Sequence, residues 1–110
     1  EGTAGTTTIT GGTITSESGN ALLCSYGTVE IRGSPTILRG SSTDTTKVRE
    51  KSTIDISDGG TVTIKAGTIT ARSQYAIWVG QGTLTQTGGT VKTGCNADGS
   101  GGTTTDAIHY

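Results

Sequence analysis

The chain has 110 residues, of which 29% are hydrophobic and 4% aromatic, with 19 Gly and 25 Thr. The formal net charge of −1 gives no electrostatic footprint for nucleic acid or an anionic membrane. No apolar run approaches the roughly 18 residues of a membrane span. So small an apolar fraction is typical of a disordered chain unless a regular pattern gathers it into one core.

A recurring Gly-Thr phrase supplies that pattern. It reads GTTTITGGTI from Gly5, GTVEIRGSPTI from Gly27, GTVTIKAGTI from Gly60 and GTLTQTGGTV from Gly82, at spacings of 22, 33 and 22 residues. Residues 5–36 and 60–91 share 13 identities over 32 positions. The sequence therefore predicts a single domain, residues 1–110, internally duplicated as approximately 5–59 and 60–110.

Each repeat unit shows the alternation of half-buried strands. Val62 and Ile64 point to one side and the intervening threonines to the other. A glycine turn leads into a second strand, and a third apolar run follows at 75–79. In chain order, strands are expected to begin near residues 6, 13, 20, 28, 36, 52, 61, 68, 75, 83, 90 and 106. Three short strands recurring every 22 residues predict an all-β fold, a parallel β-helix (β-solenoid) of about four three-stranded coils, two of them with insertions of about 11 residues.

Equivalent positions of successive coils are expected to stack in columns. Val62 should lie between Val29 and Leu84, and Ile64 should lie in line with residues 9, 31 and 86. Gln86 is the exception in an inward column; either the backbone satisfies its amide or the register shifts there. In the third strand, the sequence leaves open which residues point inward, either Ala21 and Ala76 or Leu22 and Ile77. Outward threonines should form two columns, Thr6, Thr28, Thr61, Thr83 and Thr13, Thr36, Thr68, Thr90.

The phrases ITGGTIT, GTVTIKAGTIT and TQTGGTVKTG resemble the Gly-Gly-Thr-Ile repeats of right-handed parallel β-helix segments in secreted bacterial surface proteins. The resemblance covers most of the chain. It implies right-handed coiling and an extracellular or cell-surface location. The phrases are low in complexity and indicate fold more strongly than function.

Two insertions interrupt the coils after a second strand. The first, residues 40–51, is polar and ends in a charged group, Lys47, Arg49, Glu50 and Lys51. The second, residues 94–102, is predicted to be a small flexible loop. Both should leave the same edge of the solenoid. They are either plain solvated loops or contact loops for a glycan or a neighbouring fibre.

The spacing continues past the C-terminus. The next unit would begin at position 115, which is position 5 of a second copy. No capping helix or blocked terminal strand is visible, so both ends are expected to be uncapped. Either copies stack on each other, with the terminal strands DAIHY and GTTTITGG pairing across the junction, or the chain is part of a longer solenoid. The expected interface residues are Thr6, Thr8, Ile9, Ala107, Ile108, His109 and Tyr110.

The two cysteines are predicted to lie three coils apart. That separation is about 14 Å along the axis at ~4.8 Å per coil, whereas a disulfide spans Cα separations of at most about 7 Å. An intrachain bridge between Cys24 and Cys95 is therefore not expected. Cys95 would be one coil from Cys24 of a stacked copy, which leaves open an inter-subunit disulfide or two free thiols.

The sequence offers little catalytic chemistry. His109 has no recognisable nucleophile motif beside it and is predicted to stack or pack. The acidic residues form no recurrent column, since Glu30 has threonine equivalents in the other coils, Thr8, Thr63 and Thr85. Asn96, Asp98 and Ser100 resemble a calcium loop but bring one carboxylate and lack the bidentate acid of a full site. No catalytic, cofactor-binding or metal-binding residue is assigned, and the chain is not expected to be an enzyme.

The primary functional hypothesis is a structural unit of an extracellular fibre, built by end-to-end strand stacking with copies of itself as partner. The alternative is an adhesive or glycan-binding module that uses the outward threonines, the 40–51 segment, Tyr26, Tyr75 and Trp78. A third hypothesis is ice binding through the threonine columns, which Leu38 and Lys92 interrupt in two of four coils.

Overall fold

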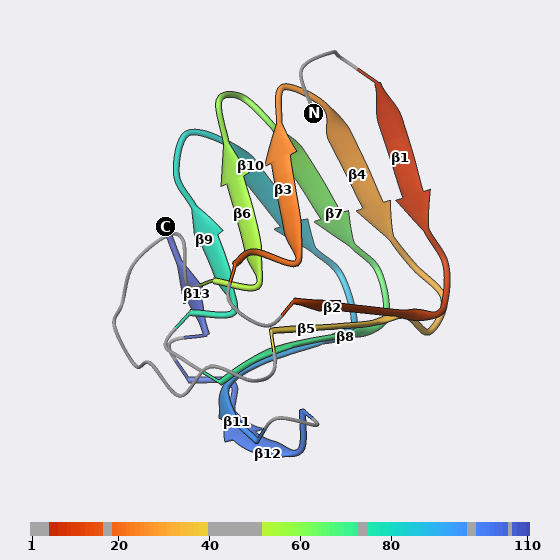
Figure 1. Cartoon of the computed structure of the whole chain (residues 1–110). Helices are drawn as coiled ribbons and strands as arrows, with labels where there is room; N and C mark the ends of the chain where they lie inside the picture. Colours follow the sequence, from red (N-terminus) through yellow and green to blue (C-terminus); the bar gives the residue numbers. More distant parts are fainter. Residues whose placement is uncertain (1–4, 17–18, 40–51, 73–74, 97–98, 106) are drawn as a thin grey trace.

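The computed structural model of the chain describes residues 5–16, 19–39, 52–72, 75–96, 99–105 and 107–110. These residues form β-strands joined by turns and include no helix, so none of them lies in a helix long and apolar enough to cross a membrane. The strands lie in three sheets, here called A, B and C, which the chain visits in rotation (Figure 1). One pass through the three sheets is called a coil below.

All strands but one run parallel to their neighbours within the described residues. Sheet A contains β1 (Thr6–Ile9), β4 (Thr28–Ile31), β7 (Thr61–Ile64) and β10 (Thr83–Gln86), in this order. Sheet B contains β2 (Thr13–Ser16), β5 (Thr36–Arg39), β8 (Thr68–Ala71) and β11 (Thr90–Cys95), with β12 (Gly101–Thr103) antiparallel beside β11. Sheet C contains β3 (Leu22–Ser25), β6 (Ile54–Ser57), β9 (Ile77–Val79) and β13 (Ile108–His109). The predicted all-β fold with parallel pairing is confirmed.

The predicted inward columns hold the core. Val62 pairs with Val29 on one side and with Leu84 on the other, and Ile64 lies in line with Ile31 and Gln86. The exposed fraction of Val62 and Ile64 is 0%. Adjacent members of a column are one strand spacing apart, about 4.8 Å, so a narrow stack of aliphatic side chains excludes water with few apolar residues.

The third strand of each coil points its first residue inward. Leu22, Ile54, Ile77 and Ile108 form one inward column. The alanines that precede these strands are also packed at the corner, where the amide of Ala76 donates to the carbonyl oxygen of Ala107 at 2.7 Å. Both sets of residues that the sequence offers as alternatives are therefore covered, one inside the strand and the other at its start.

The outward columns follow the predicted register as well. Thr28 pairs with Thr6 and Thr61, and Thr36 pairs with Thr13 and Thr68. The surface over sheet B is not a flat threonine array, however. Thr70 faces outward there yet is only 1% exposed, and Gly99 of the β11–β12 segment lies close to its hydroxyl.

Glycine enables the turn between sheets A and B. In every coil one glycine of this turn has a φ in the left-handed region, at values of 81°, 77°, 102° and 79° for Gly12, Gly33, Gly67 and Gly89. A side chain disfavours that conformation, so the Gly-Thr phrase recurs because each coil repeats the same turn.

The described residues of the second insertion, 94–96 and 99–102, belong to a pair of antiparallel strands, where the sequence predicted a flexible loop. Strand β11 continues beyond its pairing with β8, turns, and pairs antiparallel with β12 through Thr93 with Thr103 and Cys95 with Gly101. The amide of Asn96 donates to the carbonyl oxygen of Ser100 at 2.9 Å. The composition GCNADGSGG hides the strand because the pairing uses backbone groups and not side chains. The first insertion, 40–51, lies outside the described residues.

Candidate functional site

The end of the molecule formed by β1, β2 and β3, here called the N-terminal end, presents one edge strand of each sheet. The inward side chains of this coil, Ile9, Ile14 and Leu22, are half-buried. Their partners one coil along have an exposed fraction of 0%. Within the described residues, the core is therefore incomplete at this end, where the inward side chains are less buried than those one coil along.

A hollow of about 210 Å³ lies at the N-terminal end, between β1 and β3. Thr7 stands at its wall, in the inward column that holds Val29 and Val62 in the next two coils. Cys24 stands opposite, in the column that holds Ile56 in the next coil. The hollow exists because both columns carry a small side chain at this end. Its remaining wall is made by Gly5, Thr6, Leu22, Leu23, Gly27, Thr28 and Val29.

The opposite end, here called the C-terminal end, consists of β10, β11 and β13. Strands β10 and β13 are edges of sheets A and C. β12 pairs with Thr93 and Cys95, beyond the stretch 90–92 of β11 that pairs with β8. Leu84 and Ile108 are half-buried here, and Tyr110 is 77% exposed. The hairpin that occupies one strand edge at this end was not foreseen from the sequence.

Gln86 occupies the inward column of sheet A at the C-terminal end. Its register is unshifted, since it pairs with Ile64. Its side-chain Nε2 donates to the carbonyl oxygen of Gly88 at 3.3 Å. Of the two readings left open by the sequence, the structure thus favours satisfaction by the backbone.

The structure divides the predicted interface residues between the two ends. Thr6, Thr8 and Ile9 lie on β1 at the N-terminal end. The others lie in or beside β13 at the C-terminal end, Ala107, Ile108, His109 and Tyr110. The two groups thus lie at opposite ends of the molecule, and their role as an interface stays a prediction.

The predicted pairing of DAIHY with GTTTITGG would join strands that belong to two different sheets. β13 lies in sheet C and β1 in sheet A, and parallel sheets grow by adding a strand to their own edge. A copy that continues the sheets would place its β1 beside β10, its β2 beside β11 and its β3 beside β13. Sequence order does not reveal this difference, because the last strand and the first strand are consecutive along the repeat and lie in different sheets.

The cysteines are both free and both buried, at 2% and 4% exposure for Cys24 and Cys95. Cys24 lies near the corner between sheets C and A, with Sγ 3.5 Å from the carbonyl oxygen of Gly27. Cys95 ends β11 near the corner between sheets B and C, with Sγ 3.7 Å from the carbonyl oxygen of Gly101. These corners are about three residues of strand apart, roughly 10 Å. Because of this lateral offset, an axial separation of one coil does not by itself bring the two thiols within reach of a disulfide, and the inter-subunit bond stays a prediction.

Three rings meet on the outer face of sheet C. Trp78 and His109 are partners in register, and their rings stack with centroids 4.0 Å apart at an interplanar angle of 18°. The ring of Tyr75 lies 5.7 Å from Trp78 and 4.9 Å from His109. All three are half-buried. His109 is thus a stacking residue, as predicted, and Trp78 belongs to the outer face.

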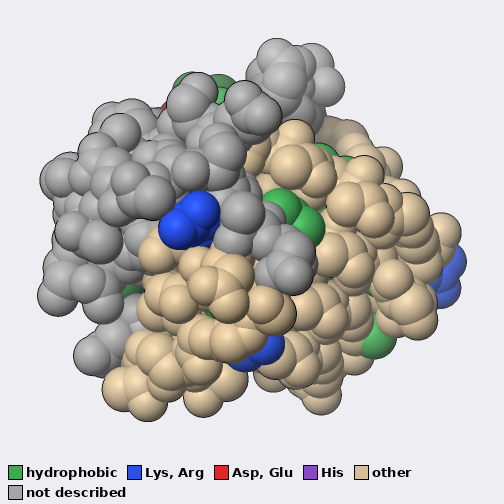
Figure 2. Space-filling model, turned by 60° about the horizontal axis from the view of Figure 1, so that its bottom comes forward, with side chains coloured by type: hydrophobic (Ala, Val, Ile, Leu, Met, Phe, Trp, Pro, Cys, Tyr) green, Lys and Arg blue, Asp and Glu red, His purple; other side chains and the backbone are tan. Residues whose placement is uncertain are grey.

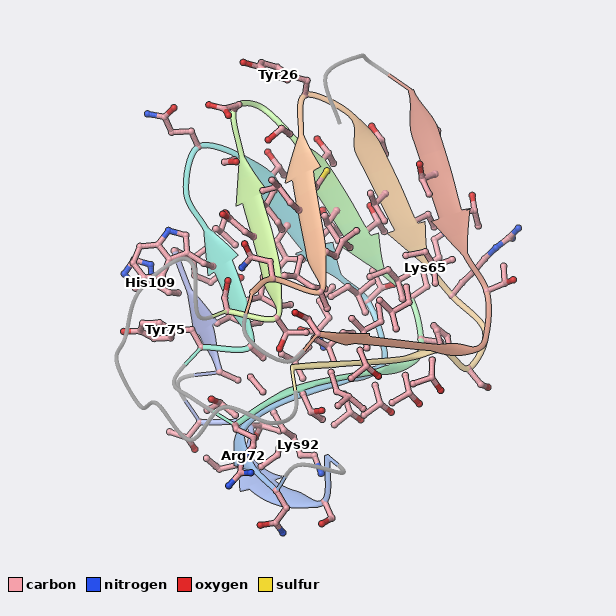
Figure 3. All side chains as sticks on the ribbon, in the orientation of Figure 1. Tyr26, Lys65, Arg72, Tyr75, Lys92 and His109 are labelled. Atoms are coloured by element: carbon pink, nitrogen blue, oxygen red, sulfur yellow. The ribbon has the colours of Figure 1, made fainter. Side chains whose placement is uncertain are left out.

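Tyr26, the third aromatic residue of the glycan hypothesis, lies apart from this group. It occupies the turn between β3 and β4, is 58% exposed, and stands far from Tyr75 and His109 in Figure 3. The three aromatics named from the sequence therefore do not form one surface. The charged residues of the first insertion, Lys47, Arg49, Glu50 and Lys51, lie outside the described residues.

Glu30 anchors a charge cluster on the outer face of sheet A. Its Oε2 lies 2.7 Å from Lys65 Nζ, and its Oε1 lies 3.5 Å from Arg32 Nε. The hydrogen bond from Lys65 and the attraction of both cations hold the pKa of Glu30 below its usual value of 4.5, against an opposing effect of desolvation. Lys65 follows β7, one coil beyond Glu30, so the pair links two coils.

Substituting Glu30→Gln should reduce the acid sensitivity of the fold. Because the pKa of Glu30 is lower in the folded than in the unfolded chain, the ionised carboxylate stabilises the fold above about pH 4.5, and this contribution is lost as the pH falls through the lowered pKa. Urea unfolding midpoints should therefore drop more steeply with falling pH in the wild type than in the variant. The difference should be small for so exposed a cluster and should vanish in about 1 M salt. Parallel pH profiles would contradict the assignment.

No constellation of catalytic groups is evident in the described part of the chain. Within it, no three His, Cys, Asp or Glu side chains gather where they could hold a metal ion. Asp98 of the calcium-like stretch lies outside the described residues, and the Asn96 side-chain amide donates to Ser100 Oγ at 3.1 Å. The features that the structure offers for function are therefore the two ends and the aromatic cluster.

No protein-family model, no curated protein and no solved structure matches this chain.

Proposed function

We propose that the chain is a structural building block of an extracellular or cell-surface fibre in which copies stack end to end. The full fold is then a right-handed parallel β-helix of about four three-stranded coils, continued from copy to copy. The copies are joined as separate chains or as covalent tandem repeats. The partner is another copy of the chain, and no cofactor or catalysis is involved.

The observation that carries the proposal is the match between the two sets of strand edges. When β1 follows β10, the outward pair Thr6 and Thr83 extends one threonine column. When β3 follows β13, Leu22 meets Ile108 and continues an aliphatic column. When β2 follows β11, Ile14 meets Val91. These pairs place no like charges opposite each other. Sheets A and C would gain hydrogen bonds along their edge strands, and sheet B would gain them along the stretch 90–92 of β11, which β12 does not pair with.

The distribution of apolar surface supports stacking at the ends over contact at the sides. The exposed large hydrophobic residues of the described chain are Leu23 at 49%, Tyr26 at 58% and Tyr110 at 77%. Leu23 belongs to the N-terminal end, and Tyr110 follows the edge strand β13 at the other end. The face in Figure 2 is mostly tan, with only scattered green and blue side chains where residues are described. Burial of apolar area would therefore be gained mainly at the ends.

Electron microscopy of the purified chain tests the proposal. Filaments should form with a layer spacing of ~4.8 Å and an axial repeat of about 19 Å for four coils. Ile14→Lys, which puts a charge into the apolar surface of the N-terminal end, should abolish the filaments. Thr13→Lys, which points outward from the same strand, is the matched control and should leave them intact. Circular dichroism would confirm that both variants fold, and monomeric wild type at millimolar concentration would overturn the proposal.

The aromatic cluster supports glycan binding as a second candidate function. Tyr75 and Trp78 offer half-buried rings on an outer face, which is the kind of surface on which sugar rings stack. A glycan array probed with wild type and Trp78→Ala would test this candidate, with Tyr26→Ala as control. Binding that survives Trp78→Ala would remove the cluster from consideration.

A further inference from the structure

Two neighbouring inward columns change in side-chain size from one end of the molecule to the other. The column in sheet A runs from Thr7 through two valines to Leu84. The column in sheet C begins at Cys24 and passes through Ile56 and Val79. β13 ends at His109, which pairs with Trp78, and Tyr110 follows it outside the strand. If a stacked copy continued the register by one residue, Tyr110 would be set in line with Val79, in the inward column by alternation. The sheet A column therefore grows from Thr7 to Leu84, and Cys24 at the N-terminal end is the smallest paired member of the sheet C column.

The hollow lies where the two small residues face each other. Its volume is about 210 Å³, and Thr7, Cys24 and Leu22 stand in its wall. An apolar cavity of about 150 Å³ is known to accept a benzene ring, so the hollow has room for the ring of a tyrosine. At the other end, Tyr110 has 77% of its surface exposed.

The stacked register brings the large residues of one copy to the small residues of the next. With β3 placed beside β13, Cys24 lies opposite Tyr110, and with β1 placed beside β10, Thr7 lies opposite Leu84. The same register sets Leu23, which is 49% exposed, against the ring of His109. Two of the large hydrophobic residues exposed in the described chain would thus be covered at one junction.

We propose that Tyr110 of one copy inserts its ring into the hollow between β1 and β3 of the next copy, with Leu84 packing beside it. This inference rests on the proposed end-to-end stacking and specifies its contact. It makes the assembly head-to-tail, because the knob and the hole lie at opposite ends of each copy. The partner that fits the hollow is therefore a second copy in one orientation.

The test compares the concentrations at which filaments appear, for the full chain and its variants. Tyr110→Ala should raise the critical concentration by about 30-fold or more, as expected for a buried aromatic anchor. Tyr110→Phe, which keeps the ring, should assemble like the wild type. Thr7→Phe should fill the hollow and block assembly, whereas the double variant Thr7→Phe/Tyr110→Ala should assemble better than Thr7→Phe alone because the new ring replaces the missing one.

The possible results distinguish a failure of the Tyr110 insertion from a failure of end-to-end stacking. Wild-type filaments together with an unchanged critical concentration in Tyr110→Ala would overturn the insertion and leave the stacking standing. Wild-type chains that stay monomeric would overturn both. Thermal unfolding of each variant at low concentration shows whether the monomer is intact. If Thr7→Phe raises monomer stability yet leaves assembly unchanged, the hollow is filled within the copy and the insertion is likewise refuted.

Discussion

Replacing Ile64 by alanine should lower the free energy of unfolding by about 3 kcal/mol, a fall in Tm of roughly 15 °C for a domain of this size. Ile64 has an exposed fraction of 0% and stands between Ile31 and Gln86 in its column. The coils on either side are held by parallel strand pairing and cannot close around the lost methyl groups, so a cavity remains. Urea denaturation at a concentration where the chain is monomeric measures the change.

Ile9→Ala is the matched control, because Ile9 stands in the same column in the end coil. Ile9 is only half-buried, so its truncation should cost about 1 kcal/mol or less in the monomer. The difference between the two losses of unfolding free energy measures how much the burial of this column depends on having a coil on both sides. Equal losses at the two positions would mean that the end coil is as well packed as the interior, and the incomplete core that motivates stacking would not exist.

The columns could be predicted from the sequence because the spacing of the glycines sets the register. Each Gly-Thr phrase begins a strand, so equal offsets from Gly5, Gly27, Gly60 and Gly82 identify the partners directly. The placement of Val62 between Val29 and Leu84 follows from counting alone. Period-two alternation then assigns the inward side wherever apolar and polar residues take turns.

The third strand escaped this reasoning because its residues do not alternate. Ala76, Ile77 and Val79 are all buried, and the outward position between the last two holds Trp78, which the stacked ring of His109 partly covers. Asp55, which pairs with Trp78 and occupies the same outward position one coil earlier, is buried too, at 2% exposure. Burial on both faces removes the periodic signal.

The functional features were harder to predict than the fold. The hollow depends on the sizes of Thr7 and Cys24, which face each other across two sheets and lie 17 positions apart in the chain. The hairpin at 94–102 depends on backbone pairing that glycine-rich composition does not reveal. The strands that would pair between two stacked copies could not be predicted either, because the pairing depends on which sheet each terminal strand belongs to.

Replacing Gly88 by alanine should lower the free energy of unfolding by about 3 kcal/mol, because a Cβ there would overlap the carbonyl oxygen of Lys65 in the preceding coil. Gly11 is the matched control at the equivalent place in the first coil, where a Cβ would meet nothing within 4 Å. Neither glycine has a left-handed φ, so Gly11→Ala should be neutral or stabilising by up to about 1 kcal/mol.

The sequence alone would suggest that alanine is harmless at position 88, since the aligned residue one coil earlier is Ala66. In the coil that precedes Ala66, however, the turn between sheets A and B is one residue longer than in the other coils and includes Pro35. Gly88 packs against a turn of the ordinary length. Thermal unfolding of Gly88→Ala and Gly11→Ala separates the two readings. A large loss for Gly88→Ala alone would show that glycine is needed here for the close approach of successive coils. Similar stabilities would show that the coils have room to move apart, and the tight axial spacing that stacking requires would then have to be reconsidered.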